Sequence, residues 1–324
     1  MDPRPFISHR LLPTGHLQTM VGTLFGGAPQ WSGTRYEKIP LPDGDELVLG
    51  IDWAPGDDGS KPLILLMHGL GGSGESSYIR RQCYLLNKHG FSVLRFNHRG
   101  CGPAALDQAR HIYHSGRTAD LAATLAYVQR AWPGRRCAVV GYSLSGNLLL
   151  RYLGTTAASS HPHLVQALAV CPAVDLERSS QALMRPSNWP IDRFFSFHVT
   201  RQALAHEARR APEERRPLRH GLNLRQFDAA YTAPVAGFAS RDEYYALSSA
   251  KDVLGHIELP TLILAAADDP IVPVASFAGL RLSAQTTLRI EDGGGHMGFI
   301  SHEVTALGDR RWLDAQVLTW ARSL

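Results

Sequence analysis

The stretch Cys137-Ala-Val-Val-Gly-Tyr-Ser-Leu-Ser-Gly-Asn-Leu-Leu-Leu-Arg151 joins a short apolar run to a segment with helical spacing. Residues 137–140 include two β-branched side chains, which predicts a buried strand. Residues 148–153 continue with the apolar spacing of a helix. The turn between them, 141–146, is crowded with small residues. This pattern is typical of a serine held on a sharp strand-to-helix turn at the carboxyl edge of a parallel sheet.

Ser143 is the candidate nucleophile on this turn. Because the turn strains the serine backbone, the residues two before and two after it must be small. Gly141 meets the first requirement, and Ser145 stands where a second glycine is usual. A glycine-serine-small pattern also arises by chance. A catalytic interpretation therefore needs a base, an acid and an oxyanion-binding loop elsewhere in the chain.

The composition is that of a globular protein with a substantial core. Of the 324 residues 44% are hydrophobic and 19% are charged, and the net charge is only +4. The 15 histidines are dispersed along the chain. The sequence contains no basic stripe interleaved with aromatic residues, which argues against a nucleic-acid partner.

Cysteine usage and the first residues of the chain indicate the compartment. Cys83, Cys101, Cys137 and Cys171 form no C-x-x-C pair, so neither a zinc site nor a redox pair is predicted. The N-terminal residues lack a charged region followed by an apolar one. No apolar run approaches the ~20 residues that span a bilayer. We therefore expect a soluble, cytoplasmic protein without stable membrane insertion.

A second glycine-rich turn follows another apolar run. Residues 62–67 predict a strand that is covered on both faces, and the loop 68–74 follows it with the sequence His-Gly-Leu-Gly-Gly-Ser-Gly. A backbone N–H in such a loop can point at a developing oxyanion, and we expect Leu70 and Leu144 to be the two donors. The alternatives are a phosphate-binding loop, whose G-x-x-x-x-G-K-[ST] and G-x-G-x-x-G patterns are not met, and a plain turn.

Strands and helices alternate along the rest of the chain, which predicts an α/β fold with a mostly parallel central sheet flanked by helices. A hairpin is expected at residues 35–53. The stretch from 176 to 259 breaks the alternation, because it is long and mostly helical. We therefore predict a core formed by residues 1–175 and 260–324, into which a helical cap, residues 176–259, is inserted.

The cap and the loop that precedes it hold side chains whose use is open. Most aromatic residues of the cap are expected to form a small core, with an acyl pocket as the alternative; they are Trp189, Phe194, Phe195, Phe197, Phe227 and Tyr231. The arginine-rich run 209–216 is expected to be a solvated helix face, with membrane contact as the alternative. His111 and His114 have helical spacing, but a zinc site would need a further ligand. They are expected to be loop histidines at the mouth of the site.

The remaining catalytic candidates follow the last two core strands. Asp268 and Asp269 come after the run 260–267, and His296 follows three glycines after a strand at 287–291. The order serine, acid, histidine is that of the α/β-hydrolase fold. Histidine would take the serine proton, and the carboxylate would fix the imidazole tautomer. Asp269 is favoured as the acid because of its D-P-x-V-P context, with Asp268 as the alternative.

The sequence resembles the YheT-like branch of the α/β-hydrolases. This resemblance implies a serine carboxylic-ester hydrolase, often for medium or long acyl chains, without a metal or organic cofactor. By motif it assigns the nucleophile to Ser143, the acid to Asp269 and the base to His296. Ser145 departs from the family pattern, which has glycine there, and His98 stands where phenylalanine is usual. The matching stretches span nearly the whole chain: His16–Thr19, His68–Gly72, Tyr78–Arg80, Asn97–Gly100, Gly141–Asn147, Phe227–Asp228, Thr232–Pro234, Gly237–Phe238, Tyr244–Tyr245 and Gly294–Phe299.

The sequence therefore predicts a serine carboxylesterase whose partner is a small-molecule acyl ester. Two alternatives remain open at this point. The same three residues could transfer an acyl group to an alcohol instead of water. The pocket could also belong to a non-catalytic module that binds a lipid or a small molecule.

Overall fold

The computed structural model describes residues 5–24, 27, 33–102 and 109–324. Within them eight strands form one sheet in the order β1-β2-β4-β3-β5-β6-β7-β8. β1 and β2 form the predicted antiparallel hairpin, and β2 also pairs antiparallel with β4. The other neighbours pair in parallel, so the predicted mostly parallel sheet is confirmed. The strands are β1 (Arg35–Pro40), β2 (Glu46–Asp52), β3 (Leu63–Met67), β4 (Val93–Phe96), β5 (Cys137–Tyr142), β6 (Leu164–Val170), β7 (Thr261–Ala266) and β8 (Thr286–Glu291).

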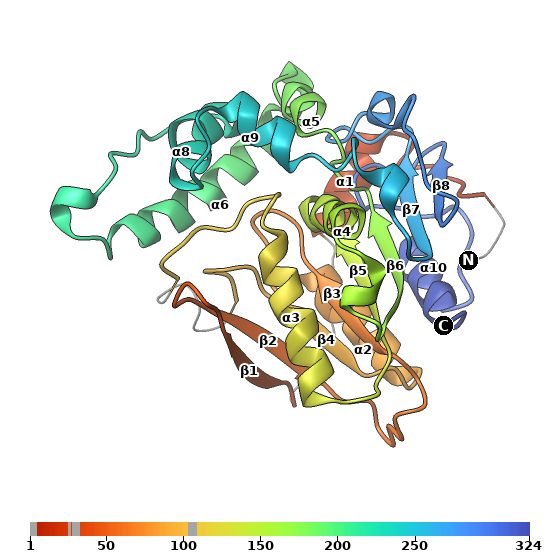
Figure 1. The fold of residues 1–324 in the computed structure, drawn as a ribbon. Coiled ribbons are helices and arrows are strands. Elements are labelled where there is room, and N and C mark those ends of the chain that lie inside the picture. The colour runs from red at the N-terminus through yellow and green to blue at the C-terminus, as the bar shows by residue number, and fades with distance from the viewer. Residues whose placement is uncertain (1–4, 25–26, 28–32, 103–108) are drawn as a thin grey trace.

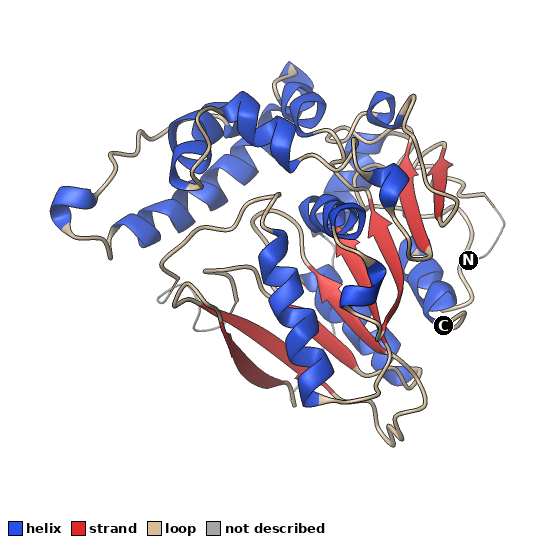
Figure 2. Cartoon of the chain, in the orientation of Figure 1, coloured by secondary structure: helices blue, strands red, loops and turns tan. Residues whose placement is uncertain are grey.

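Helices cover both faces of the sheet (Figure 2). Successive side chains of β3 point to opposite faces. Leu63 and Leu65 join the core under α3 and α4, whereas Ile64 and Leu66 join the core under α2 and α10. Burial on both faces explains why β3 is an uninterrupted apolar run. The helices are α1 (Gly15–Leu24), α2 (Ser77–Lys88), α3 (Thr118–Ala131), α4 (Leu144–Thr155), α5 (Leu176–Leu183), α6 (Trp189–Glu207), α7 (Leu224–Phe227), α8 (Ala233–Val235), α9 (Arg241–Ser248) and α10 (Trp312–Ala321).

The segment between β6 and β7 holds helices and no strand. It contains α5 to α9, with a π-helical turn at Asp228–Thr232 between α7 and α8. Figure 1 shows these helices gathered beyond the end of the sheet toward which the central strands point. Residues 176–259 therefore lie where they can cover the carboxyl edge, the edge at which loops of a parallel sheet meet.

Two expectations for this segment are wrong in part. Trp189, Phe194 and Phe197 of α6 are exposed and form no small core, whereas Phe227 and Tyr231 are buried. The run 209–216 is solvated, as expected, but it is not a helix face, since α6 ends at Glu207 and only a short 3₁₀ turn, Pro212–Glu214, follows. Pro212 prevents α6 from continuing through the run.

The N-terminal arm, residues 5–24, packs against the core. Gln18 and Thr19 of α1 are buried. A Cβ atom built at Gly15 would lie 1.8 Å from the backbone oxygen of Asp268, and one at Gly298 would lie 2.2 Å from the backbone oxygen of Gln18. The arm therefore supports the loops that follow β7 and β8, and both glycines are required by the close approach.

The structure also bears on membrane insertion. Within the part of the chain that the structure describes, none of the helices combines the length and the apolar character of a bilayer-spanning segment.

Candidate active site

The serine turn has the strained geometry expected from its sequence. Ser143 joins β5 to α4 with φ 54° and ψ −114°, a region that non-glycine residues rarely occupy. Its backbone N–H donates to the Val170 carbonyl of the neighbouring strand over 2.9 Å. A Cβ atom at Gly141 would lie 2.6 Å from the Ser145 carbonyl oxygen, and one at Gly146 would lie 2.9 Å from the Cβ of Pro172. Both glycines are therefore needed for this turn to pack against the sheet.

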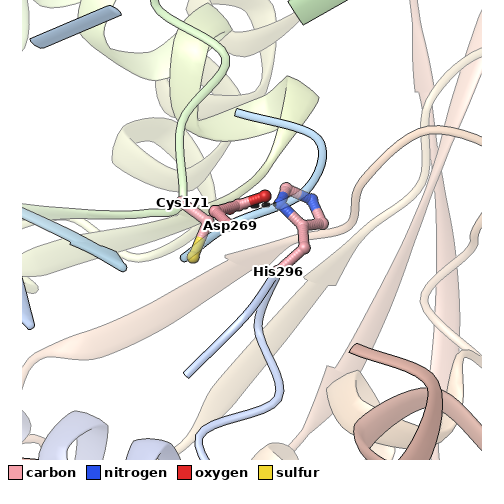
Figure 3. A group of neighbouring side chains, drawn as sticks. All are labelled: Cys171, Asp269 and His296. Atoms are coloured by element: carbon pink, nitrogen blue, oxygen red, sulfur yellow. Dashed lines mark hydrogen bonds and ion pairs between the residues drawn. The ribbon is translucent and has the colours of Figure 1, made fainter. Parts of the chain in front are cut away.

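A continuous hydrogen-bonded series joins the three predicted catalytic side chains. The Ser143 Oγ lies 2.8 Å from the His296 Nε2. The His296 Nδ1 lies 2.8 Å from the Asp269 Oδ2, and Figure 3 shows the two side chains pointing toward each other. All three residues are buried. The side chains come from three loops, each of which follows a parallel strand, so the sheet brings together residues that are far apart in the sequence.

The Asp269 carboxylate is held by the backbone on its other side. Its Oδ1 accepts hydrogen bonds from the N–H groups of Ile271 over 2.8 Å and Val272 over 2.9 Å. These bonds fix the carboxylate with Oδ2 toward the imidazole. The Cys171 thiol lies beside this carboxylate (Figure 3), and burial raises the pKa of Cys171 well above its usual value.

Asp268 has a different partner. Its Oδ1 accepts the backbone N–H of Gly295, the residue before His296, over 2.8 Å. Burial raises the pKa of Asp268, against the opposing effect of this hydrogen bond. Asp268 therefore braces the histidine loop, while Asp269 contacts the imidazole.

Thr19 of the N-terminal arm also holds the histidine loop. Its hydroxyl accepts the backbone N–H of His296 over 2.8 Å and donates to the Gly15 carbonyl over 2.7 Å. The neighbouring Gln18 accepts the N–H of Ile300 over 2.7 Å. Reasoning from the residues alone missed this role. The only signal was the motif His-Leu-Gln-Thr at residues 16–19. Its polar residues lie on a short helix that is far in the sequence from the strands that precede the predicted catalytic residues.

The glycine-rich loop after β3 lies against the serine. A Cβ atom at Gly69 would lie 3.2 Å from the Ser143 Cβ and 3.8 Å from its Oγ. Most N–H groups of this loop have acceptors: the N–H of Gly69 donates to the Tyr78 hydroxyl, that of Gly71 to the Tyr113 hydroxyl and that of Gly74 to the Asn97 side chain.

The backbone N–H groups of Leu70 and Leu144 lack the acceptors that the other residues of this loop have. In the same loop, the N–H groups of Gly72 and Ser73 donate to the Gly69 carbonyl and the Ser76 hydroxyl. Among the described residues from 69 to 74, only the Leu70 N–H has no hydrogen-bond acceptor. Leu144 is the first residue of α4, so its N–H has no acceptor within the helix. Two backbone donors on either side of Ser143 are thus available to a ligand.

Ser145 and His98, the two residues that depart from the family pattern, contact each other. The His98 Nε2 lies 2.8 Å from the Ser145 Oγ, and the Ser145 hydroxyl donates to the His68 carbonyl over 2.5 Å. Because a serine hydroxyl carries one proton, Ser145 accepts from His98, which assigns the proton of His98 to Nε2. The backbone N–H of His98 in turn donates to the His68 Nε2 over 3.2 Å. This buried network ties the serine turn to the loop that carries Leu70.

Burial determines the charge of the two histidines. Both rings are nearly inaccessible to solvent. Burial lowers the pKa of His68 to about 4, and burial with the neighbouring His68 lowers the pKa of His98 well below its usual value. His98 is also stacked on Tyr113, with ring centroids 4.8 Å apart. Both histidines are therefore neutral near pH 7 and act as fixed hydrogen-bonding groups.

A cavity of about 140 Å³ opens beside Ser143. Its walls come from the loops of the core and from the helices of residues 176–259. His111 and His114 line it, as expected for loop histidines at the site, and burial lowers the pKa of His114 to about 4. The apolar side chains of its wall are Leu70, Ile112, Leu144, Leu176, Leu183, Phe195, Val199, Leu224, Phe227 and Ile271.

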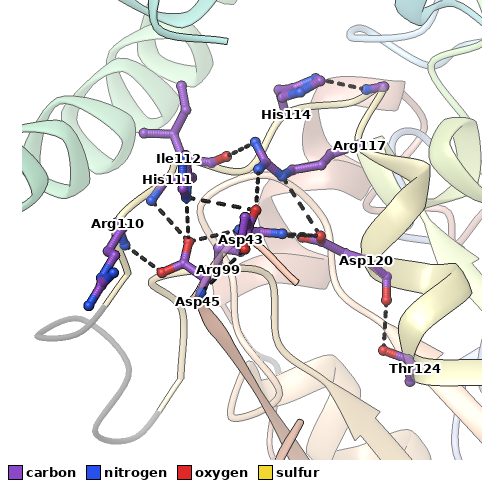
Figure 4. Close-up of polar contacts among 11 residues, drawn as sticks. Asp43, Asp45, Arg99, Arg110, His111, Ile112, His114, Arg117, Asp120 and Thr124 are labelled. Atoms are coloured by element: carbon purple, nitrogen blue, oxygen red, sulfur yellow. Dashed lines mark hydrogen bonds and ion pairs between the residues drawn. The ribbon is translucent and has the colours of Figure 1, made fainter. Parts of the chain in front are cut away.

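Arg99, a charged residue of the cavity wall, is neutralised by three carboxylates. It contacts Asp43, Asp45 and Asp120 at distances of 2.7 to 2.8 Å (Figure 4). Burial acts to raise the pKa of Asp45, but hydrogen bonds from the Arg110 N–H and the Arg99 guanidinium outweigh it and lower the pKa. Asp45 also accepts the backbone N–H of His111, so the network fixes the segment that carries His111.

Two side-chain groups among the described residues have atoms close enough together to bind a metal ion. They are Cys171 with Asp269 and His296, and Asp43 with Asp45 and His111. Asp269 and His296 of the first group are engaged in the series that ends at Ser143. The carboxylates of the second group already contact Arg99, whose positive charge opposes a cation there. Neither donor set is better suited to a metal than to the hydrogen bonds it makes.

Comparison with known proteins agrees with this geometry. Residues 62–303 match the model of the α/β hydrolase fold family. The chain belongs to this family. It is 30% identical over 331 residues to YheT of Escherichia coli, across 97% of this chain and 92% of that protein. It is 29% identical over 280 residues to phospholipase ABHD3 of Mus musculus, across 82% and 66%.

A solved structure supports the same fold. An esterase of Pyrococcus furiosus superposes with a TM-score of 0.57 at 15% identity, and the match covers 92% of this chain and 97% of that one. The family and the relatives identify the chain as an enzyme, a hydrolase of the esterase and lipase type that acts on carboxylic esters.

The buried histidines predict a pH dependence of stability. Below about pH 6.5 the unfolded chain binds protons at these positions and the folded chain does not, so stability is lost as the pH falls toward the lowered pKa values. The double substitution His98→Phe/Ser145→Gly removes one of these groups. It should reduce the loss of unfolding free energy between pH 7 and pH 5 by up to about 1.4 kcal/mol per pH unit.

Urea unfolding at the two pH values measures this difference. The exposed His256 provides the control, since His256→Gln should leave the loss unchanged. An equal loss in the wild type and the double variant would show that His98 is not held neutral.

Proposed function

We propose that the protein is a serine carboxylesterase that hydrolyses acyl esters through an acyl-enzyme. Ser143 is the nucleophile, His296 the general base and acid, and Asp269 the residue that orients and stabilises the imidazole. The observation that carries this proposal is the series of two 2.8 Å contacts from Ser143 through His296 to Asp269. The same arrangement of roles recurs in serine hydrolases on several folds.

The reaction proceeds in two balanced halves. The Ser143 hydroxyl gives its proton to the His296 Nε2 as Oγ bonds to the ester carbonyl carbon, and the carbonyl oxygen takes the negative charge. Collapse of this intermediate breaks the bond to the alkoxide, which leaves with the proton from His296. Water then attacks the acyl-enzyme in the same way, and the acid is released with Ser143 regenerated.

Leu70 and Leu144 are proposed as the oxyanion donors. Their N–H groups are the candidates on the two sides of Ser143, and they are fixed before substrate binds. Preorganised donors of this kind stabilise charge that develops only in the transition state, and each is worth about 10²–10³ in turnover. The His98–Ser145–His68 network would hold the two N–H donors in a fixed position relative to each other, because it joins the segments that carry them.

The shape of the cavity supports medium or long acyl chains as the preferred substrates. The wall beside Ser143 is mostly aliphatic and aromatic, and much of it comes from residues 176–259, which we propose to act as a cap. Burying each CH₂ group of an acyl chain in such a site contributes roughly 0.8 kcal/mol. Relatives of this chain are named phospholipase and monoacylglycerol lipase, which agrees with an acyl substrate of this kind.

Ser143→Ala should reduce the turnover of p-nitrophenyl acyl esters by at least about 10⁴-fold, because it removes the atom that forms the acyl-enzyme. Initial rates measured on esters from C2 to C16 test this and show the preferred acyl length. Ser159→Ala changes an exposed serine beyond the end of α4 and serves as the control. Full activity in Ser143→Ala would refute the proposal.

Asp269→Asn and Asp268→Asn should differ in their effect on turnover. The first removes the carboxylate that contacts the His296 Nδ1, and we expect kcat to fall on the order of 10³–10⁴-fold. The second keeps an oxygen that can accept the Gly295 N–H, so a loss of less than about tenfold is expected. Steady-state kinetics and circular dichroism of both variants decide the matter, and the reverse ranking would assign the acid to Asp268.

A further inference from the structure

Helix α6 has two faces with different environments. One face lines the cavity beside Ser143, through Phe195, Val199, Gln202, Ala203 and His206. The opposite face is exposed and carries large apolar side chains. Trp189 is 65% exposed, Phe194 48%, Phe197 63% and Leu204 40%. These residues, with the exposed Arg193 and Arg201 between them, are called the outer face of α6.

The outer face carries positive charge and no carboxylate. The two acidic residues of α6 are buried, and both are already hydrogen bonded. The Asp192 Oδ1 accepts the Leu224 N–H over 2.9 Å. The Glu207 carboxylate accepts the Arg216 N–H over 2.7 Å and the Tyr231 hydroxyl over 2.8 Å. Aromatic side chains and arginines therefore share one exposed surface that contains no acid.

The positive charge continues past the end of the helix. Residues 189–223 contain seven arginines and four Asp or Glu residues, a net charge of +3, whereas the whole chain has +4. Six of these arginines are exposed, but only two of the acids, Glu213 and Glu214, are exposed. The exposed charge of this segment is thus strongly biased toward arginine.

We propose that the outer face of α6 docks on an anionic lipid surface. An interfacial helix of this kind lies in the plane of the surface, with its apolar side chains between the headgroups and its basic side chains against the phosphates. Trp189 and Phe197 would supply the apolar contact, and Arg193 and Arg201 the electrostatic contact. Each basic residue near an anionic surface strengthens binding about fivefold.

A second copy of the chain fits this face less well. A two-fold dimer would place the same patch on both sides of the contact. The arginines of both copies would then meet without any carboxylate of the outer face to neutralise them. Anionic lipid supplies the missing charge, and for this reason charge complementarity favours the lipid surface.

The position of the outer face relative to the cavity indicates what docking would achieve. The cavity lies on the other side of the same helix, and Arg209, at the cavity wall just beyond the end of α6, is exposed. A docked helix would hold the mouth of the cavity close to the surface where acyl esters of lipids reside. This purpose rests on the proposed esterase function, but the docking itself does not.

Co-sedimentation of the full chain with vesicles tests the proposal. The probes are vesicles of phosphatidylcholine alone and of phosphatidylcholine mixed with phosphatidylglycerol. We expect binding to the mixed vesicles that weakens as salt is added, and at least tenfold weaker binding to phosphatidylcholine alone. Equal or absent binding to both kinds of vesicle would overturn the proposal.

Two paired variants assign the binding to the outer face. Trp189→Ser/Phe197→Ser and Arg193→Gln/Arg201→Gln should each weaken binding to the mixed vesicles at least tenfold. Leu11→Ser/Val304→Ser is the matched apolar control, since both residues are exposed and lie outside α6. Arg10→Gln/Arg130→Gln, which also removes two exposed arginines outside α6, is the matched control for charge. Both controls should bind like the wild type, and equal losses in variants and controls would contradict the proposal.

Further measurements separate lipid docking from a damaged fold, from the assignment of the nucleophile and from the formation of a dimer. Hydrolysis of a short, water-soluble p-nitrophenyl ester should be unchanged in Trp189→Ser/Phe197→Ser, which shows that the fold and the catalytic residues are intact. Ser143→Ala should bind vesicles like the wild type, so docking can stand even if the nucleophile assignment fails. A dimer that the paired aromatic variant dissociates, without vesicle binding by the wild type, would show that a second copy covers the face.

Discussion

The strained backbone of Ser143 is the constraint on which the site depends. Its positive φ aims the hydroxyl away from the sheet, and the surroundings must stabilise a conformation that costs about 1–3 kcal/mol. The Val170 carbonyl accepts the Ser143 N–H. The lack of a side chain at Gly141 lets the first turn of α4 approach β5, and the lack of one at Gly146 lets it approach Pro172, which follows β6. The other residues of the proposed catalytic site, His296 and Asp269, are positioned relative to this turn.

The loops around the serine are held by hydrogen bonds that do not take part in the proposed chemistry. Thr19 and Asp268 hold the backbone that carries His296, and two backbone N–H groups fix the Asp269 carboxylate. His98 and Ser145 join the serine turn to the glycine-rich loop. Because all of these contacts except the partly buried one of Asp268 are buried, they hold the proposed reacting groups in place with little competition from solvent. Exclusion of water is the condition for electrostatic stabilisation of a transition state.

The sequence predicted the sheet and the residues at the strand ends, because apolar runs and glycine-rich turns are local signals. The contact of Ser143, His296 and Asp269 followed from the rule that parallel strands end at one edge. The buried role of Thr19 could not be derived in this way, because it depends on where the arm packs. The exposure of Trp189 and Phe197 was also missed, since an aromatic residue on a helix gives no sign of whether a partner element will cover it.

The acyl-enzyme is the central claim, and it is tested most directly by trapping it. Brief mixing of the protein with a p-nitrophenyl ester, acid quench and peptide mass spectrometry measures which residue carries the acyl group. The account predicts an acyl mass on Ser143, in an amount that matches the initial burst of p-nitrophenol. Acylation of Ser145, or full turnover with no acylated peptide at any quench time, would contradict it.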